Sequence, residues 1–308
     1  MMRILITGAS GMVGQNLLAH KAATENHILC PSSKQLNLKD LCAVTNYLVS
    51  EQPDFIIHAA GKVGGIQANM ADPIGFLDDN LLIGRNLVMA ARDVGIKNFL
   101  NLGSTCMYPR ICKNPLVEDA ILSGELEPTN EGYALAKIMV DRLCQYISLQ
   151  HEELNYKTII PCNLYGPFDK FSPENSHLVP AIIHKIHLAK TRGQQTVEIW
   201  GDGTARREFM YAGDLADAIW KAVSGFDTVP RIFNCGLGYD YSVNEYYQVA
   251  ARVIGWSGKF IHLLEKPVGM KQKLADVSRQ KCWGWSPSTS LEDGLAKTYE
   301  FYLSGEEL

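Results

Sequence analysis

Four side chains with complementary acid–base chemistry lie in one stretch of the chain, residues 101–137. Ser104 and Cys106 are two residues apart, and Tyr133 and Lys137 are four apart. A tyrosine and a lysine at positions i and i+4 lie on one face of a helix, close enough to act together. A hydroxyl, a thiol, a phenol and an ammonium that share a pocket can move protons beside a carbonyl group. The stretch therefore predicts proton transfer at a ketone.

Tyr133 and Lys137 form the strongest of these pairs. A free tyrosine has a pKa of ~10, and lowering it by ~3 units takes ~4 kcal/mol of differential interaction. A lysine cation one helical turn away, in a water-poor pocket, could supply much of that. We expect the phenol to protonate the oxygen formed when hydride reaches a ketone, while Ser104 hydrogen-bonds to the same oxygen. A Tyr-x-x-x-Lys spacing alone is also typical of an ordinary helix surface.

The first twenty residues predict a dinucleotide site. Residues 3–7 (RILIT) read as a short strand, followed by Gly8, Gly11 and Gly14 and then by an apolar helix. Such glycines allow a tight turn, a close approach of the backbone to a pyrophosphate, and close packing of helix on strand. The helix N-terminus offers free N–H groups to the phosphates. A glycine triplet alone also occurs in unrelated α/β turns, but the flanking strand and helix favour the cofactor.

The end of the second predicted strand, residues 27–30, bears on which cofactor binds. NAD enzymes commonly place a carboxylate there, on the ribose hydroxyls. Here Ser32, Ser33 and Lys34 follow, and the next carboxylate is Asp40. Two hydroxyls and a lysine suit a ribose phosphate that an acid would repel. We therefore expect NADP(H), although a solvated loop charge is the alternative explanation of Lys34.

Short apolar strands alternate with helices through the first half of the chain. Further strands are predicted at residues 54–60, 98–103 and 157–162. The alternation predicts a parallel, doubly wound sheet of the Rossmann type. The carboxyl ends of such strands meet at the edge where ligands bind, so Ser104 and Cys106 are expected there. His58, inside a strand, is expected to be a core residue.

After Tyr165 the alternation gives way to polar, irregular segments mixed with shorter elements. We predict an NADP(H)-binding Rossmann domain over residues 1–165, to which later segments at about 210–240 return. A smaller α/β substrate domain is predicted over residues 166–308.

Composition excludes several classes of protein. The 308 residues are 46% apolar and 20% charged, which is ordinary for a soluble globular chain. A net charge of −4 gives no sign of a nucleic-acid or membrane surface. The chain enters a strand at once without a leader pattern, and no apolar run approaches the ~18 residues of a membrane helix. Eight scattered cysteines indicate neither a zinc site nor a disulfide framework, so we expect a cytoplasmic protein with reduced thiols and no metal.

Taken together, the motifs resemble the extended short-chain dehydrogenase/reductase family, and within it the epimerase/reductases of GDP-4-keto-6-deoxymannose. In chain order the matching motifs are GMVG (residues 11–14), AAGKVGGI (59–66), GSTCMYP (103–109), EPTNEGYALAK (127–137), NLYGP (163–167), NSHLVPA (175–181) and WGDGTARREF (200–209). They cover nearly the full length, and the last three are far more specific than a nucleotide-binding loop.

The resemblance implies epimerisation at C3 and C5 of the sugar, followed by reduction at C4 with NADPH, to give GDP-L-fucose. The 4-keto group acidifies the neighbouring protons, and by motif match Cys106 and His177 exchange them. A thiol with an ordinary pKa of ~8.5 and an imidazole of ~6.5 bracket neutral pH. We take Cys106 as base and His177 as acid, although the reverse stays open. Taken singly, each also fits a structural role: Cys106 as a packing residue and His177 as a helix cap.

The resemblance also implies the residues around both ligands. The contacts to NADP(H) are Gly8, Ser10, Gly11, Met12, Val13, Gly14, Ser33, Lys34, Asn37, Leu38, Ala59, Ala60, Lys62, Leu102, Tyr133, Lys137, Pro161, Asn163, Leu164 and His177. The contacts to the GDP-sugar are Ser104, Asn130, Asn163, Val179, Lys185, Trp200, Arg207 and Lys273. The three cations suit a diphosphate, and Trp200 would stack on guanine unless it packs in the core.

Departures from the family pattern leave the identity of the sugar substrate open. Related dehydratases carry an Asp-Glu pair where this chain has Cys106 and Met107, so dehydration is not expected. Ser10 and Lys185 stand where many members have arginine. A 3,6-dideoxy sugar (GDP-L-colitose synthesis) or a 6-deoxy-heptose would use the same residues, and epimerisation at C5 only is a further alternative. An inactive NADP-binding scaffold is a distant alternative, and a homodimer is implied by the family alone.

Overall fold

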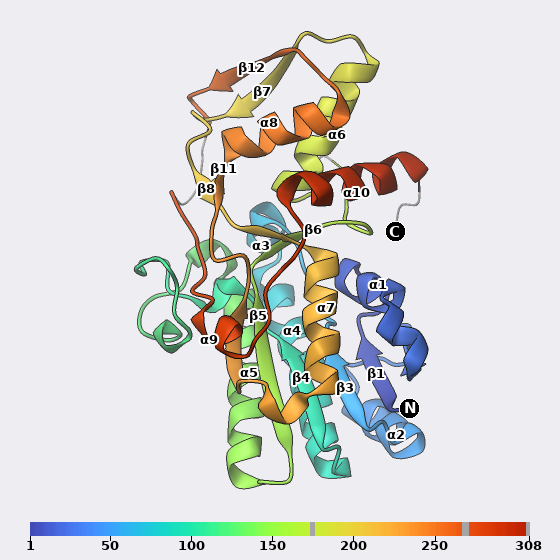
Figure 1. Ribbon diagram of the computed structural model, residues 1–308. Coiled ribbons are helices and arrows are strands. Elements are labelled where there is room, and N and C mark those ends of the chain that lie inside the picture. The colour runs from blue at the N-terminus through green and yellow to red at the C-terminus, as the bar shows by residue number, and fades with distance from the viewer. Residues whose placement is uncertain (173–175, 267–270, 306–308) are drawn as a thin grey trace.

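A six-stranded parallel sheet forms the lower half of the molecule in Figure 1. The computed structural model describes residues 1–172, 176–266 and 271–305, so Asn175 of the NSHLVPA motif lies outside the described residues. The sheet has the order β10–β5–β4–β3–β1–β2. Its strands are β1 (Arg3–Thr7), β2 (His27–Leu29), β3 (Phe55–His58), β4 (Asn98–Leu102), β5 (Asn155–Pro161) and β10 (Ile232–Cys235).

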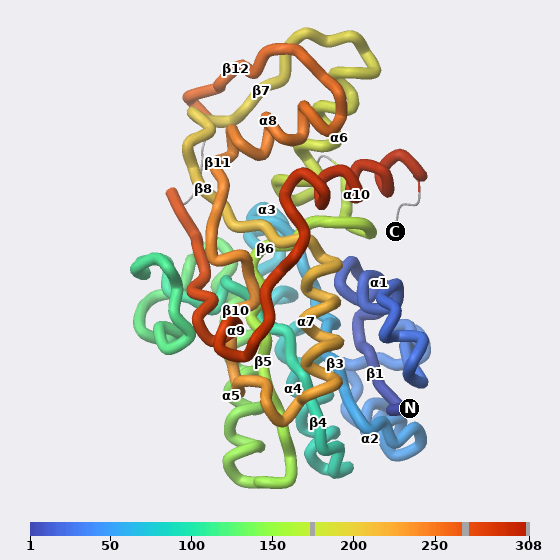
Figure 2. The backbone as a smooth tube through the Cα atoms, in the orientation of Figure 1, coloured from blue at the N-terminus to red at the C-terminus, as the bar shows by residue number. Residues whose placement is uncertain are grey.

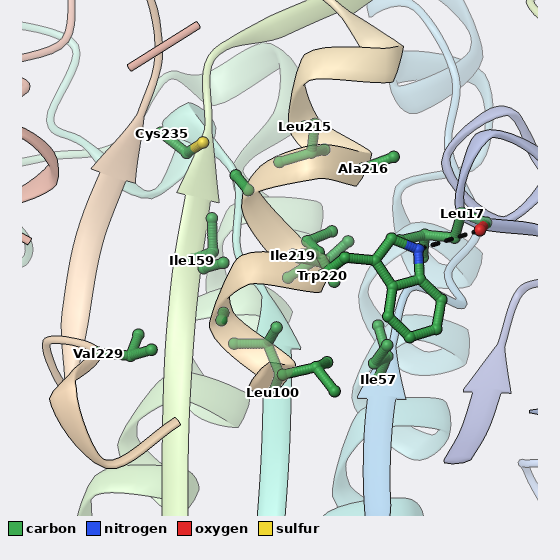
Figure 3. Packing of buried hydrophobic residues seen from close by; sticks show 14 of the residues in the cluster. Leu17, Ile57, Leu100, Ile159, Leu215, Ala216, Ile219, Trp220, Val229 and Cys235 are labelled. Carbon is green, nitrogen blue, oxygen red and sulfur yellow. Dashed lines mark hydrogen bonds between the residues drawn. The ribbon is translucent and has the colours of Figure 1, made fainter. Parts of the chain in front are cut away.

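Helices cover both faces of this sheet. One face carries α1 (Met12–Ala19) and α7 (Ala212–Ser224), and the other carries α2 (Leu41–Glu51), α4 (Pro73–Val94) and α5 (Glu131–Gln150). The alternation of side chains along a strand divides the two cores: Ile4 and Ile6 pack toward α7, and Leu5 packs toward the opposite layer. Figure 3 shows the first core, where the Trp220 indole N–H donates to the Leu17 carbonyl at 3.1 Å.

The predicted Rossmann-type sheet is confirmed, and its strand order places the ligand crevice. From β1 the chain moves outward to β2, then returns to β3 on the other side of β1. In doubly wound sheets ligands bind at the carboxyl ends of the strands where the order reverses, which here are β1 and β3. His58, at the end of β3, is 2% exposed and hydrogen-bonds through Nδ1 to the Thr7 hydroxyl, which confirms it as a core residue.

A second hydrophobic core lies above the carboxyl edge of the sheet, in the upper half of Figure 1. It is built from α6 (Leu178–Thr191), α8 (Val243–Ile254), α10 (Leu291–Ser304) and the parallel pair β7 (Thr196–Trp200) and β12 (Lys259–Leu263). Helix α8 begins at a capping box, in which the Ser242 hydroxyl and the Glu245 carboxylate each satisfy the other's backbone N–H.

Short elements connect the two parts. Figure 2 shows the chain descending to α9, beside β10, before it rises to α10. The short strands and helices are β6 (Asn163–Tyr165), β8 (Arg206–Arg207), β9 (Phe209–Tyr211), β11 (Tyr241–Ser242), α3 (Ile66–Ala71), α9 (Ser278–Cys282), and the 3-10 helices η1 (Lys21–Glu25), η2 (Thr105–Met107), η3 (Glu118–Ala120), η4 (Pro128–Asn130) and η5 (Phe226–Thr228). Among the described helices, none combines the length and apolarity needed to cross a bilayer.

Candidate active site

Strand β4 delivers Ser104 and Cys106 to the carboxyl edge of the sheet. Ser104 caps η2, and its hydroxyl accepts a hydrogen bond from the Cys106 backbone N–H at 3.2 Å. This turn fixes the hydroxyl and the thiol side by side. Both residues are half-buried, between the sheet and the first turns of α5. The placement expected from the strand pattern is thus the one observed.

Helix α5 brings Tyr133 and Lys137 to the same place. The Tyr133 phenol hydrogen-bonds with the Ser104 side chain, and the ring lies 5.8 Å from the Lys137 ammonium, measured to the ring centroid. Lys137 is 8% exposed, and its Nζ donates to the Leu102 carbonyl at 2.9 Å. The four groups of the 101–137 stretch therefore meet at the end of β4.

The expected lowering of the Tyr133 pKa is wrong for this structure. Burial raises the pKa of Tyr133, the charge of Cys106 adds to the rise, and the hydrogen bond with Ser104 opposes it. The Lys137 ammonium, 5.8 Å from the ring centroid, donates to the Leu102 carbonyl and not to the phenol oxygen. Burial in turn lowers the pKa of Lys137 to about 8, while Cys106 acts to raise it. The phenol is thus held protonated, the state from which it can give a proton to an alkoxide, which is a stronger base than a phenolate.

Cys106 has a hydrogen-bond donor of its own. The Asn130 amide, just before α5, donates to its sulfur at 3.2 Å. This hydrogen bond fixes the position of the thiol beside the start of α5. The other end of the amide, Asn130 Oδ1, is buried and has no hydrogen-bond partner among the described residues, although buried polar atoms are normally satisfied. An unpaired acceptor beside the thiol is suited to a hydroxyl group of a ligand.

His177 lies at the other side of the site, immediately before α6. It occupies the N-cap position, but its side chain accepts no capping hydrogen bond, so the structural alternative does not account for it. Burial by the surrounding chain lowers the pKa of His177, with Lys170 as a second cause. The residue nevertheless has an exposed surface, and water that reaches the ring limits this desolvation. Within the described part of the chain, His177 makes no hydrogen bond to Cys106 or Tyr133.

The glycine loop after β1 fits a pyrophosphate. Gly8 has φ +73°, and a Cβ there would lie 2.7 Å from the Ala60 backbone at the end of β3. A Cβ on Gly14 would lie 2.3 Å from the Gly8 carbonyl, so the helix packs directly on the loop. At Gly11, by contrast, a Cβ would meet only the Gly8 carbonyl, at 3.5 Å. The space around Gly11 is therefore open. Helix α1 begins there without a side-chain cap, so its first backbone N–H groups are available to an anion.

The predicted ribose-phosphate contacts lie in the loop after β2. Ser33 and Lys34 are exposed, and the Asp40 carboxylate is engaged in capping α2, where it accepts from the Ala43 N–H at 3.1 Å. Asn37 and Leu38 lie between them. Asp40, the first acidic residue after β2, thus caps a helix and does not stand at the strand end, where a carboxylate would bind the ribose hydroxyls.

One residue that the sequence reasoning missed, Asn80 on α4, fixes the next loop. It is 5% exposed, accepts from the Lys62 N–H at 2.8 Å and donates to the Lys62 carbonyl at 3.0 Å. This reciprocal pair holds the backbone that follows Ala60. The Lys62 ammonium itself is paired with Asp72 and Asp79, at 2.6 and 3.2 Å. The sign of this role in the sequence was a polar asparagine within an apolar helical stretch.

The other predicted cofactor contacts gather at the same edge of the sheet. Ser10, Met12 and Val13 are in the glycine loop and the first turn of α1, and Ala59 follows β3. Leu102 ends β4. Pro161 ends β5, and Asn163 and Leu164 form β6.

The predicted substrate residues lie on several elements and differ widely in exposure. Trp200 is 51% exposed, which excludes core packing, and the Lys185 ammonium lies 5.7 Å from its ring centroid. Val179 is 1% exposed, inside the second core. Arg207 is half-buried on β8, and Lys273 is half-buried in the irregular segment that follows residue 270.

A Rossmann-type sheet with serine, tyrosine and lysine at the end of its fourth strand defines a class of nucleotide-dependent oxidoreductases and epimerases. Residues 4–236 match the NAD dependent epimerase/dehydratase family, and the chain belongs to it. It is 52% identical over 303 residues to GDP-L-colitose synthase of Yersinia pseudotuberculosis, covering 98% of each chain. It is 50% identical to GDP-L-fucose synthase of Azorhizobium caulinodans, over 99% of this chain and 98% of the relative. Among solved structures, a GDP-D-glycero-L-gluco-heptose synthase of Campylobacter jejuni with NADPH is similar with a TM-score of 0.91 at 28% identity, covering 98% of both chains.

Proposed function

We propose that this chain is an NADPH-dependent epimerase/reductase that converts GDP-4-keto-6-deoxymannose to GDP-L-fucose. The observation that carries the proposal is the group of side chains at the end of β4. It combines the Ser104, Tyr133 and Lys137 set of a ketone reductase with a thiol, Cys106, that has its own hydrogen-bond donor at 3.2 Å. The two relatives at 50% and 52% identity, named for GDP-L-fucose and GDP-L-colitose synthesis, support the same chemistry.

In the reduction, Ser104 and Tyr133 hold the C4 oxygen. NADPH, when bound, supplies the hydride to C4. Tyr133 then gives its proton to the C4 oxygen, so the ketone becomes an alcohol, and Ser104 stabilises the charge that develops there. Lys137 holds a positive charge one helical turn away, anchored by the Leu102 carbonyl.

In the epimerisation, the 4-keto group makes the protons on C3 and C5 acidic. Cys106 removes such a proton as thiolate, and His177 returns one to the opposite face of the carbon. The charge that forms in between rests on the C4 oxygen, where Ser104 and Tyr133 donate. The unpaired Asn130 Oδ1 accepts a sugar hydroxyl and thereby orients the ring beside the thiol.

The cofactor is NADP(H), held by the glycine loop and by the segment after β2. Gly8, Gly11 and Gly14 bring the backbone to the pyrophosphate, and Ser33 and Lys34 bind the ribose phosphate. The remaining contacts are those predicted at the ends of β3, β4 and β5. The GDP moiety lies between Trp200, on the guanine, and the cations Lys185, Arg207 and Lys273, on the diphosphate.

A second candidate is the same chemistry on a 3,6-dideoxy sugar. It is favoured by the 52% identity to a GDP-L-colitose synthase. Such a sugar has no hydroxyl at C3, so epimerisation takes place at C5 only. A GDP-6-deoxy-heptose would instead need room beyond C6 for its seventh carbon. The similarity to a GDP-heptose synthase structure supports this alternative.

The deciding experiment follows NADPH oxidation at 340 nm with purified GDP-4-keto sugars. We expect absorbance loss with GDP-4-keto-6-deoxymannose and incorporation of solvent deuterium at C3 and C5. Loss with the 3-deoxy analogue alone would refute the fucose assignment and support the colitose one. No loss with any GDP-keto sugar would leave only an inactive NADP-binding scaffold.

We also propose a homodimer formed through α4 and α5. These helices pack side by side and expose apolar side chains on their outer faces: Ile74, Leu77, Leu135, Met139, Tyr146 and Leu149. Light scattering should give twice the 34.2 kDa of the chain, and Met139→Glu should give the monomer mass. A monomer in the wild type would contradict this.

The cytoplasmic location, the absence of nucleic-acid and membrane partners, and the domain division at residue 165 stay predictions.

A further inference from the structure

Two cations of the proposed diphosphate site come from segments that are distant in the sequence. Arg207 ends β8, and Lys273 lies in the irregular segment 271–276. We propose that Glu208 is the positioning residue that holds these two segments, and thus both cations, at one site. The inference rests on the proposed function, since it concerns the same GDP-sugar site. Glu208 itself is 1% exposed and does not reach the ligand.

The Glu208 carboxylate is held by three backbone amides from two different segments. Oε1 accepts from the N–H groups of Leu237 and Gly238, at 2.7 and 2.9 Å. Oε2 accepts from the Ala275 N–H at 2.8 Å. Successive N–H groups next to a residue with positive φ, here Gly238 at +74°, form an anion-binding concavity, and the carboxylate fills it. One side chain thus ties β8–β9, the 236–238 turn and the 271–276 segment together.

Lys273 lies midway between two attachments to the strand that carries Arg207. The Lys271 carbonyl accepts from the Arg206 N–H at 2.9 Å, and Ala275 is bound to Glu208. Between them, the Asp240 carboxylate accepts from the side chains of Arg206 and Gln272, at 2.5 and 2.6 Å. The segment is also bound to residues 114–116, since the Leu274 N–H donates to Asn114 Oδ1 at 2.8 Å and the Leu116 N–H donates to the Leu274 carbonyl at 2.8 Å. The Glu208 attachment is what ties this end of the segment to the strand of Arg207. Without it, Lys273 would follow residues 114–116 rather than Arg207.

Gly236 leaves the room that the carboxylate occupies. A Cβ at this position would lie 2.5 Å from Glu208 Oε1 and 3.2 Å from the carboxyl carbon. Gln280 holds the same glycine from the other side, accepting from its N–H at 2.8 Å and donating to its carbonyl at 3.0 Å. The glycine, the glutamine and the carboxylate therefore form one fixed unit.

Both carboxylate oxygens act as acceptors, and this distinguishes Glu208 from an amide of the same shape. Within the described residues, no lysine or arginine forms an ion pair with it. A glutamine would turn an N–H2 group toward either Ala275 or the 237–238 amides, so one attachment must break. Leaving a buried amide unpaired costs about 1–3 kcal/mol. If that cost is expressed as lost positioning of the cations, it corresponds to about 5- to 150-fold in a binding constant.

The experiment compares Glu208→Gln with the wild type in GDP binding by calorimetry and in steady-state kinetics with the keto sugar. We expect the Kd for GDP and the KM for the sugar to rise about 5- to 150-fold, with kcat and the Kd for NADPH within about twofold. Asp141→Asn is the matched control, because Asp141 is also a buried carboxylate but pairs with Arg231 on the α5 side of the sheet. It should lower thermal stability and leave GDP affinity unchanged.

A double-mutant cycle separates positioning from general damage. If Glu208 acts through the two cations, the effect of Glu208→Gln on GDP affinity should shrink to within about threefold in a background that carries both Arg207→Ala and Lys273→Ala. Penalties that add fully would overturn the proposal, as would wild-type GDP affinity in Glu208→Gln. A wild-type protein that binds no GDP would instead refute the proposed function. Should Glu208→Gln fail to fold, Gly236→Ala displaces the same carboxylate, and unchanged GDP affinity in that variant would equally overturn the role.

Discussion

Lys137 and Lys185 are both placed at the proposed site, yet their surroundings are opposite. Lys137 is 8% exposed, and its ammonium is already bound to the Leu102 carbonyl at 2.9 Å. Lys185 lies on the exposed face of α6, with its ammonium 5.7 Å from the Trp200 ring. Burial lowers the pKa of both lysines, but only Lys137 is enclosed by protein on all sides.

This difference separates two tasks of the molecule. The reduction centre at the end of β4 is fixed by hydrogen bonds within the protein, so its geometry exists before any ligand arrives. The substrate rim (Lys185, Trp200, Arg207 and Lys273) lies on α6, two short strands and an irregular segment, and its side chains are exposed or half-buried. A change of residue there alters selectivity without disturbing the sheet. Substitutions in the first region should therefore act on rate, and those in the second on affinity. The Glu208→Gln experiment tests the second region, and the predictions below test the first, from the largest expected effect to the smallest.

Replacing Tyr133 by phenylalanine should reduce NADPH oxidation on the order of 10²- to 10⁴-fold, because the proton donor at the C4 oxygen is lost. Cys106 and His177 remain in place, so deuterium should still enter the sugar at C3 and C5. The two measurements are absorbance at 340 nm and mass spectrometry of the recovered sugar. Retention of more than about a tenth of the wild-type rate would show that another group protonates the oxygen.

Cys106→Ser should stop deuterium incorporation while leaving part of the direct reduction. A serine hydroxyl is far too weak a base to replace a thiolate at neutral pH. The keto sugar would then be reduced without inversion, and the product would be the unepimerised alcohol, identified by NMR. Wild-type deuterium incorporation at C3 and C5 in this variant would refute the role of Cys106. Cys112→Ser, another half-buried cysteine on the same packing cluster, is the control and should behave as the wild type.

Asn130→Ala should slow deuterium incorporation by about 10-fold, because the thiol loses the donor that orients it. The variant removes the amide that donates to Cys106 at 3.2 Å, and one such hydrogen bond to a charged group is worth about 1.5–3 kcal/mol. Asn130→Asp is the matched comparison, because it keeps the shape of the side chain and removes the N–H donor. If both variants incorporate deuterium at the wild-type rate, Asn130 does not act on the thiol.

The fold and the reduction centre were predictable from the sequence because their determinants are local. Alternating strands and helices, three glycines, and a Tyr–Lys pair one turn apart each have a direct geometric meaning. The direction of the Tyr133 pKa shift was not predictable, since it depends on how far the folded chain buries the phenol. Asn80 and Glu208 were also missed, because each acts through backbone atoms of segments that only the folded chain brings together.

The smallest expected effect is a pair of opposite pH dependences that both come from Lys137. Its pKa is about 8 in the folded chain, against ~10.4 for a free lysine. Loss of its charge should lower kcat/KM for reduction as pH rises through about 8. Stability should move the other way. Between the folded and unfolded pKa values the unfolded chain binds more protons, so the free energy of unfolding rises with pH from about 8 to ~10.4. Urea titrations of wild type and Lys137→Met at pH 7, 8, 9 and 10 measure the difference. We expect the stability of the wild type relative to the variant to increase over this range, and a constant difference would show that Lys137 keeps an ordinary pKa in the folded protein.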